Sequence, residues 1–313
     1  MNFIPRVCTS LVLMQRSLQV MRRHPRLLLF PVVSLACMLV LALFFFTPVL
    51  VVFAQRGWTS LPQWAQVGER LGDFVPRDWV RLWEEHRAAI FAYGAVVYFV
   101  SLFVSTFFNV AFYTEILSAL NGGPVSLRAG FRFAASRGRT ILMWTLLAGS
   151  VGFILRVIEE RLSVVGRLVV GLIGATWSVA AMFAIPVIVR RAEPNAVAVL
   201  RDSATTLKRT WGESVTGFIG LELGGALLMM LLALVGIPLA AVAAQARWPL
   251  VGLSLGALTV LAMIGVGFVA GMATHIYRCA LYVYASEGVV PGDYTAEMMD
   301  AGWKVKEELN AGG

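Results

Sequence analysis

The chain has 313 residues, of which 58% are apolar and only 14% are charged. Soluble domains carry roughly 45–50% apolar and about 25% charged residues, so this composition excludes an ordinary water-soluble protein. The formal net charge is +8, but the basic residues flank long uncharged stretches instead of forming a soluble basic face. We interpret them as topology signals and as attraction for anionic lipid headgroups, and we expect no nucleic-acid partner.

Residues 1–26 are basic and are predicted to form an amphipathic helix at the cytoplasmic surface. Residues 27–287 are predicted to form one transmembrane domain, because six stretches can each cross ~30 Å of hydrocarbon as a helix of about 20 residues. The first stretch is too long for the hydrophobic region of a cleavable signal peptide, so it should stay in the membrane. The predicted spans are residues 27–54, 88–114, 140–158, 168–189, 214–246 and 248–274.

A short basic, amphipathic stretch leads into each odd-numbered span, at residues 16–26, 127–139 and 201–211. Arg16 and Arg23 are seven residues apart, as are Arg201 and Lys208, which places each pair on one face of a helix. We expect three tandem units, each a surface helix followed by a membrane hairpin. The predicted fold is therefore an all-α polytopic transmembrane bundle of three helical hairpins with amphipathic cytoplasmic connector helices.

The largest segment between spans, residues 55–87, is predicted to lie outside. It carries Trp58, Trp64, Trp79 and Trp83. The last two are one helical turn apart, which indicates a helix lying at the outer interface with its indoles at headgroup depth. Residues 288–313 form a cytoplasmic tail too short to be an independent domain.

The distribution of basic residues sets the expected orientation. With the N-terminus inside, 17 of the 26 Lys and Arg residues lie on the cytoplasmic side and nine lie outside, where seven acidic residues largely balance them. The positive-inside rule therefore places both termini in the cytoplasm.

Two patterns that could indicate a catalytic or metal site are better explained otherwise. The sequence Gly252-Leu-Ser254-Leu-Gly256 fits a serine hydrolase motif, but it lies inside an apolar helix, and His275 is 21 residues further on, about 31 Å along the axis. The glycines are better explained as packing notches. Three scattered histidines and three unpaired cysteines do not form a metal-ligand set. We expect no catalytic residue, no metal and no cofactor, and hence no enzyme.

Glu222 is the residue most suggestive of a polar site within the membrane. It lies about eight residues into the fifth span, hence ~12 Å from the cytoplasmic boundary. A charge at that depth is costly and should face the bundle interior or a watery cavity. Glu222 could form a proton or cation site with His275 and Arg278, or an ion pair or hydrogen bond that joins the fifth and sixth spans; the second interpretation is favoured.

Asn109 and Glu115, at the cytoplasmic end of the second span, are the next candidates for a polar site. Asn109 is expected to bridge two helices rather than to bind solute. Arg156 has acidic residues three and four positions later, which predicts an ion pair at the interface. Pro48, Pro186 and Pro238 predict kinks within spans.

Several short motifs resemble those of a bacterial six-span membrane family of unknown function. The motifs are Phe107-Phe-Asn109-Val-Ala, Ile158-Glu-Glu-Arg161, Trp177-Ser, Ile185-Pro-Val, Leu207-Lys-Arg-Thr-Trp-Gly-Glu213, Ala280-Leu-Tyr and Gly288-Val-Val-Pro291. The resemblance covers most of the chain from about residue 15 and departs in the long outer segment. It implies the same fold and a location in the bacterial inner membrane, but no activity and no functional residues.

Two functions remain open from the sequence, and the first of them is favoured slightly. One is a channel- or transporter-like protein for a small ion or lipid, with Glu222 near the route. The spans carry few of the polar residues that usually line such a route. The other is a non-catalytic subunit or scaffold of a larger membrane assembly, formed by a homo-oligomer or with another membrane protein. A polar cavity at Glu222 would favour the first, and a dry interior with broad apolar outer faces would favour the second.

Overall fold

The computed structural model of the protein describes residues 15–55, 77–191, 195–209, 211–246, 248–291 and 294–295. Within these ranges all regular elements are helices, which confirms the predicted all-α fold. Residues 15–23 are helical. The elements that follow are η1 (Pro25–Leu28), α2 (Leu29–Gln55), α3 (Arg77–Leu120), α4 (Leu127–Ser136), α5 (Gly138–Arg161), α6 (Val164–Ala180), α7 (Ala184–Arg190), α8 (Ala196–Arg209), α9 (Trp211–Gln245) and α10 (Pro249–Glu287).

Six helical stretches of the described chain are long and apolar enough to cross a membrane, as predicted. They are Pro25–Pro48, Glu85–Leu120, Gly138–Arg161, Val164–Arg190, Gly224–Gln245 and Pro249–Glu287. The sixth continues past His275, as expected from its sequence. The segment with Trp79 and Trp83 is helical, as predicted, and it is continuous with the second span, because α3 begins at Arg77. Trp58 and Trp64 lie outside the described residues.

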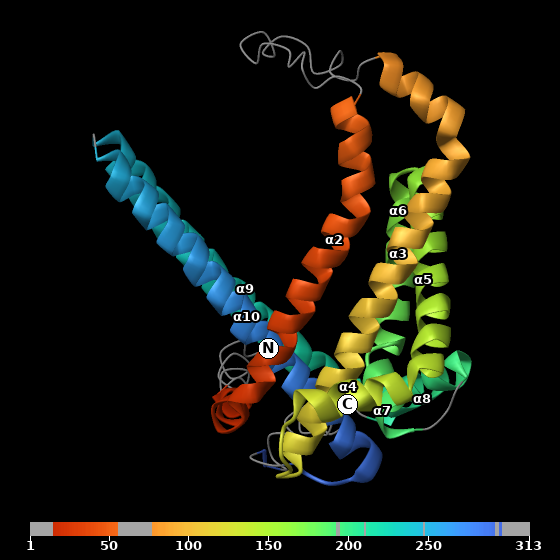
Figure 1. Cartoon of the computed structure of the whole chain (residues 1–313). Helices are drawn as coiled ribbons and strands as arrows, with labels where there is room; N and C mark the ends of the chain where they lie inside the picture. Colours follow the sequence, from red (N-terminus) through yellow and green to blue (C-terminus); the bar gives the residue numbers. More distant parts are fainter. Residues whose placement is uncertain are drawn as a thin grey trace.

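The spans form three hairpins, α2–α3, α5–α6 and α9–α10, and an amphipathic helix precedes each of them (Figure 1). These connecting helices are residues 15–23, α4 and α8, in the order that the repeat predicts. They gather at one end of the molecule, which we call the connector face. The hydroxyls of Ser17 and Tyr294 are 2.8 Å apart in a buried hydrogen bond, so both ends of the described chain meet at this face.

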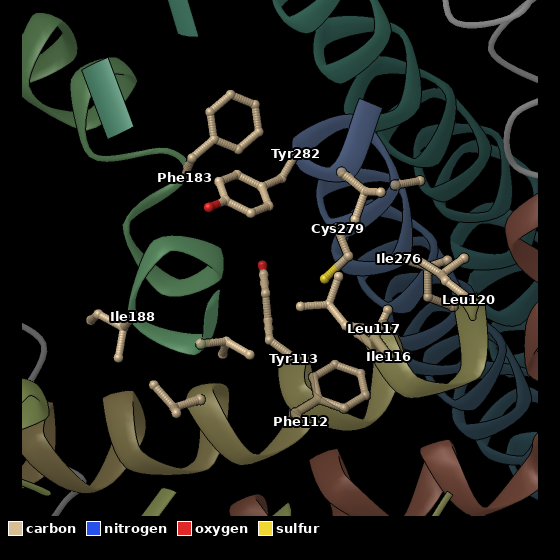
Figure 2. Close-up of a cluster of buried hydrophobic side chains, with 14 of the residues drawn as sticks. Phe112, Tyr113, Ile116, Leu117, Leu120, Phe183, Ile188, Ile276, Cys279 and Tyr282 are labelled. Carbon is tan, nitrogen blue, oxygen red and sulfur yellow. The ribbon is translucent and has the colours of Figure 1, made fainter. Parts of the chain in front are cut away.

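The buried core lies close to the connector face rather than at the middle of the spans. It is built from the last turns of α3, from α7 and from the last third of α10, with α4 and α8 packed against them. Figure 2 shows part of this core, with Phe112 and Tyr113 of α3 directed toward α7 and α10. Away from this end, α2 and hairpin α9–α10 diverge from α3, α5 and α6, which stay side by side (Figure 1). Lipid chains solvate apolar side chains as well as other helices do, so the outer parts of α2 and of hairpin α9–α10 need no contact with the other spans.

The fourth span is broken in two, at the place where its proline disfavours a continuous helix. Pro186 lacks an N–H, and its ring would clash with the carbonyl four residues earlier, at Met182. The helix accordingly stops at Ala180 and restarts as α7 at Ala184. The buried Ser203 of α8 provides hydrogen-bond partners for backbone groups at the break. Its hydroxyl donates to the Ala180 carbonyl at 2.6 Å and accepts from the Phe183 N–H at 3.0 Å. Pro48 and Pro238, by contrast, lie inside unbroken α2 and α9.

Hairpin α9–α10 is held together by small residues. A Cβ atom on Gly236 would lie 2.2 Å from the hydroxyl of Thr259, and one on Gly252 would lie 2.8 Å from the Ala240 carbonyl oxygen. This confirms the expected packing notch at Gly252. Because the small residues face inward, the bulky aliphatic residues of both helices point away from the hairpin. Leu234 is 68% exposed and Leu250 is 79% exposed.

Candidate functional site

A polar pair joins the second and sixth spans inside the core. The hydroxyl of Tyr113 on α3 lies 2.8 Å from Nδ1 of His275 on α10, and Tyr113 is almost fully buried. The rings of Phe112 and Tyr113 both meet the imidazole edge-to-face, at 5.7 and 5.5 Å. Arg278 is one turn further along α10 and lies beside the Tyr113 hydroxyl. The sequence singled out two members of this cluster, and the structure adds Tyr113 as their partner.

Glu222 lies on α9, inside the predicted fifth span and two residues before the apolar stretch Gly224–Gln245. Its side chain is outside the part of the chain that the structure describes, so the expected contact with His275 and Arg278 stays a prediction. The described partner of His275 belongs instead to the second span. The cluster therefore ties α10 to α3 within the core.

Glu115 is 3% exposed and faces α4 rather than the polar pair. Its Oε2 accepts a hydrogen bond of 2.6 Å from the backbone N–H of Ser126, the N-cap residue of α4. The Ser126 hydroxyl in turn accepts from the N–H of Ala129, at 3.4 Å. A carboxylate that accepts from a helix N-terminus is favourably placed in the field of the helix dipole. Glu115 thus positions α4 against the end of α3.

Asn109 is half-buried on α3, one turn before Tyr113. The two phenylalanines before it pack on Phe131 of α4, with ring centroids 6.3 Å apart for Phe107 and 5.3 Å apart for Phe108. The helices α3 and α4 can approach closely because Gly130 has no side chain. A Cβ on Gly130 would lie 2.9 Å from the Ala111 carbonyl oxygen. This part of the second span therefore serves to dock a connector helix.

Ion pairs connect the elements around the cluster. Arg190, at the end of α7, lies 3.2 Å from Glu287 at the end of α10. Arg191 lies 2.6 Å from Asp202 of α8. At the opposite end of the molecule, Arg156 and Glu160 form the predicted pair at 3.2 Å, with both side chains largely exposed. Ion pairs near a protein surface contribute roughly 0–1 kcal/mol. The pairs of Arg190 and Arg191 therefore orient α7, α8 and α10 more than they stabilise the fold.

The described residues offer little for chemistry. Among them, no group of three or more His, Cys, Asp or Glu side chains could hold a metal ion. Ser254 donates its hydroxyl to the carbonyl of Val251 in its own helix, at 2.9 Å. Cys279 is fully buried among apolar side chains, near Tyr282 and Ile276 (Figure 2). The polar groups of the core are therefore arranged to join helices to one another.

Sequence reasoning missed three of the residues that join the helices: Tyr113, Ser203 and Gly130. The sequence did contain a signal for Tyr113: it lies one turn from Asn109 within a span, and a buried tyrosine hydroxyl needs a hydrogen-bond partner. The signal for Ser203 was weaker: Pro186 interrupts a helix, and the backbone groups left without helical partners need hydrogen bonds from a side chain such as a hydroxyl. Gly130 had none, because only the packing of α4 on α3 distinguishes it from the other glycines.

The six apolar helices define a polytopic all-α membrane protein. The chain belongs to DUF6159, a family of unknown function whose match covers residues 85–292. The match begins after the first span and the outer segment, so it is shorter than the resemblance from residue 15 implied. No curated protein and no solved structure matches the chain.

The residues that carry the resemblance have recognisable structural places. Trp177 of α6 stacks on Trp144 of α5, with centroids 6.4 Å apart and planes 8° apart. Gly288 caps α10 in the left-handed conformation, at φ 69°, and donates its N–H to the Tyr284 carbonyl. The described members of these motifs thus shape the fold.

Proposed function

We propose that the protein is a non-catalytic subunit or scaffold of a membrane assembly, and that it contacts a second membrane-spanning protein through hairpin α9–α10. One observation carries this proposal: α9 and α10 contact mainly each other, and among the described residues none in their most apolar stretches is buried. The two helices of the hairpin pack closely, because small residues face each other across it. It is joined to the rest of the protein mainly at its base, through α8 and α3.

The absence of a polar site on this hairpin's outer half supports the same proposal. Its described outer surface consists of aliphatic side chains such as Leu231, Leu234 and Val235 on α9, and Leu258 and Leu261 on α10. In a bilayer such surfaces gain nothing by leaving lipid, so association there depends on close packing of complementary helices. A preformed hairpin loses less conformational freedom on docking than two separate helices would.

A transporter- or channel-like protein for a small ion or lipid is the second candidate. Its support is the Tyr113–His275 pair, with Arg278 beside it, inside the spans, together with the broken fourth span. Discontinuous helices are common where transporters bind their solutes. Against it, the described polar groups near the break are already satisfied by Ser203, and the side chains around them are apolar.

Extraction in mild detergent followed by native mass measurement should find another membrane protein in fixed proportion to this chain. A photo-crosslinking residue at Val235 on α9 should join that partner, whereas the same residue at Leu172 on α6, equally apolar and exposed, should capture it at least about tenfold less. Crosslinking only to lipid, with a clean monomer in the mass measurement, would contradict the scaffold. Flux through liposomes, compared between wild type and Glu222→Gln, would then decide on transport.

We also infer that the connector face lies in the cytoplasm of a bacterial inner membrane. Exposed basic residues gather there on η1 and on the three connecting helices, and among the described acids of this face Asp202 and Glu287 are paired and Glu115 is buried. The exposed basic residues of this face include Arg22, Arg26, Arg128, Arg132, Arg201 and Lys208. Their charge suits the positive-inside rule and anionic headgroups.

Thiol labelling in intact cells tests this orientation. In a Cys8→Ser background, Arg201→Cys on α8 should react with a membrane-impermeant reagent only after the cells are broken. Arg161→Cys, exposed at the far end of α5, should react in intact cells. The reverse pattern would place the connector face outside.

A further inference from the structure

A groove lies between α3 and α5 in the half of the molecule away from the connector face. Its volume is about 410 Å³, which is within the range of roughly 300–1,000 Å³ typical of ligand sites. The residues that matter here are Phe91, Gly94 and Tyr98 of α3 and Gly152, Phe153 and Arg156 of α5. The groove extends over at least eight residues of α3, hence about 12 Å along the helix axis.

Glycines shape this groove from both sides. On the side nearer the connector face the helices touch, since a Cβ on Gly149 would lie 2.6 Å from the Phe99 ring. Beyond that contact the missing side chains leave space. A Cβ on Gly94 would meet nothing within 4 Å, and one on Gly152 would meet only the Tyr98 hydroxyl, at 3.0 Å. The groove is therefore a built feature of the α3–α5 contact.

The walls are apolar and the outer end is cationic. The hydroxyl of Tyr98 is directed to the backbone, donating to the Gly149 carbonyl at 3.3 Å. Arg156 lines the groove, and its side chain is 75% exposed although it pairs with Glu160. Arg87 of α3 lies over the ring of Phe91, 5.9 Å from its centroid. Two guanidinium groups thus stand at the end of the groove that faces the outer membrane interface.

We propose that this groove binds an anionic phospholipid, with an acyl chain along Gly94 and Gly152 and the phosphate at Arg156 and Arg87. The depth supports the assignment, because the groove opens within the span and its cations lie where headgroups begin. A guanidinium binds phosphate through two parallel hydrogen bonds. An exposed Arg–Glu ion pair is weak, so a lipid phosphate can replace Glu160 as the partner of Arg156. The site does not depend on the scaffold function proposed above.

Filling the groove should remove the lipid without disturbing the fold. Protein from vesicles of phosphatidylcholine and phosphatidylglycerol is extracted in mild detergent, and retained phosphatidylglycerol is counted by native mass spectrometry. Gly94→Leu should lower retention at least about tenfold, since each methylene kept off an apolar wall weakens binding about fourfold. The matched control is Gly171→Leu on α6, where a Cβ also meets nothing within 4 Å; it should retain the lipid.

A second pair of variants tests the headgroup contact. Arg156→Gln should lower retention of phosphatidylglycerol about tenfold, through the lost charge-assisted hydrogen bonds, and leave phosphatidylcholine unchanged. Arg167→Gln, an exposed arginine of α6, should have no effect. Equal retention in Gly94→Leu and Gly171→Leu would overturn the site. Loss in Gly94→Leu with no effect of Arg156→Gln would overturn the assignment of the phosphate to Arg156.

Discussion

Gly130→Ala is expected to lower the free energy of unfolding by about 2–3 kcal/mol, the upper part of the range for overpacking a core. The added methyl would lie 2.9 Å from the Ala111 carbonyl oxygen, 3.0 Å from Cγ of Glu115 and 3.1 Å from the Phe30 ring. The first of these is backbone and cannot move aside cheaply. Helix α4 would have to shift away from α3, which also strains the bond from Ser126 to Glu115.

Thermal unfolding in detergent, followed by circular dichroism, measures this effect. Gly138→Ala is the matched control, because it lies at the start of α5 and its Cβ would meet nothing within 4 Å. It should change stability by less than about 0.5 kcal/mol, as surface substitutions usually do. Equal melting temperatures for the two variants would show that α4 does not pack on α3 as described.

Ser203→Ala is expected to cost about 2–4 kcal/mol, because it leaves two backbone groups of the broken fourth span without a partner. These are the Ala180 carbonyl and the Phe183 N–H, which the hydroxyl now satisfies together. Phe183 and Ser203 are both fully buried, so water does not readily replace the hydroxyl. The loss should appear as a lower melting temperature and faster proteolysis near residues 181–183.

The control for this prediction lies on the same helix. Thr205 is exposed and donates its hydroxyl to the Arg201 carbonyl within α8. Thr205→Ala should therefore change stability by less than about 0.5 kcal/mol. If Ser203→Ala changed stability as little as Thr205→Ala, the Ala180 carbonyl and the Phe183 N–H would not depend on the Ser203 hydroxyl for their hydrogen bonds.

Much of the fold could be predicted because hydrocarbon imposes a simple rule on the chain. Each spanning segment must be apolar and must satisfy its own backbone, so length and hydropathy alone located six spans and their helical nature. The amphipathic stretches before the odd-numbered spans, such as residues 127–139, likewise predicted the connecting helices α4 and α8. The helix predicted around Trp79 and Trp83 is present, but it forms the first turns of α3 and continues into the second span, because polar residues at a span's end do not terminate a helix.

The candidate site was harder to predict, for a physical reason. Glu222, His275 and Arg278 stood out because charge is rare in a span, but rarity does not say which helix lies opposite. The partner of His275 is Tyr113, 162 residues away, and Glu115 bonds to a backbone N–H that has no sequence signal. Ordinary residues, such as Ser203 and Gly130, acquire their roles only from what packs against them.

The sequence by itself determined the class of protein, the six helices, the three hairpin units and the ion pair of Arg156. These follow from local properties, namely hydropathy, charge and spacing along one helix. Only the tertiary structure decided that the core lies at the connector face, that hairpin α9–α10 projects from it, and that Gly94 and Gly152 leave a groove. In lipid, apolar helix faces have no hydrophobic drive to associate, so close packing and a few polar contacts choose the arrangement.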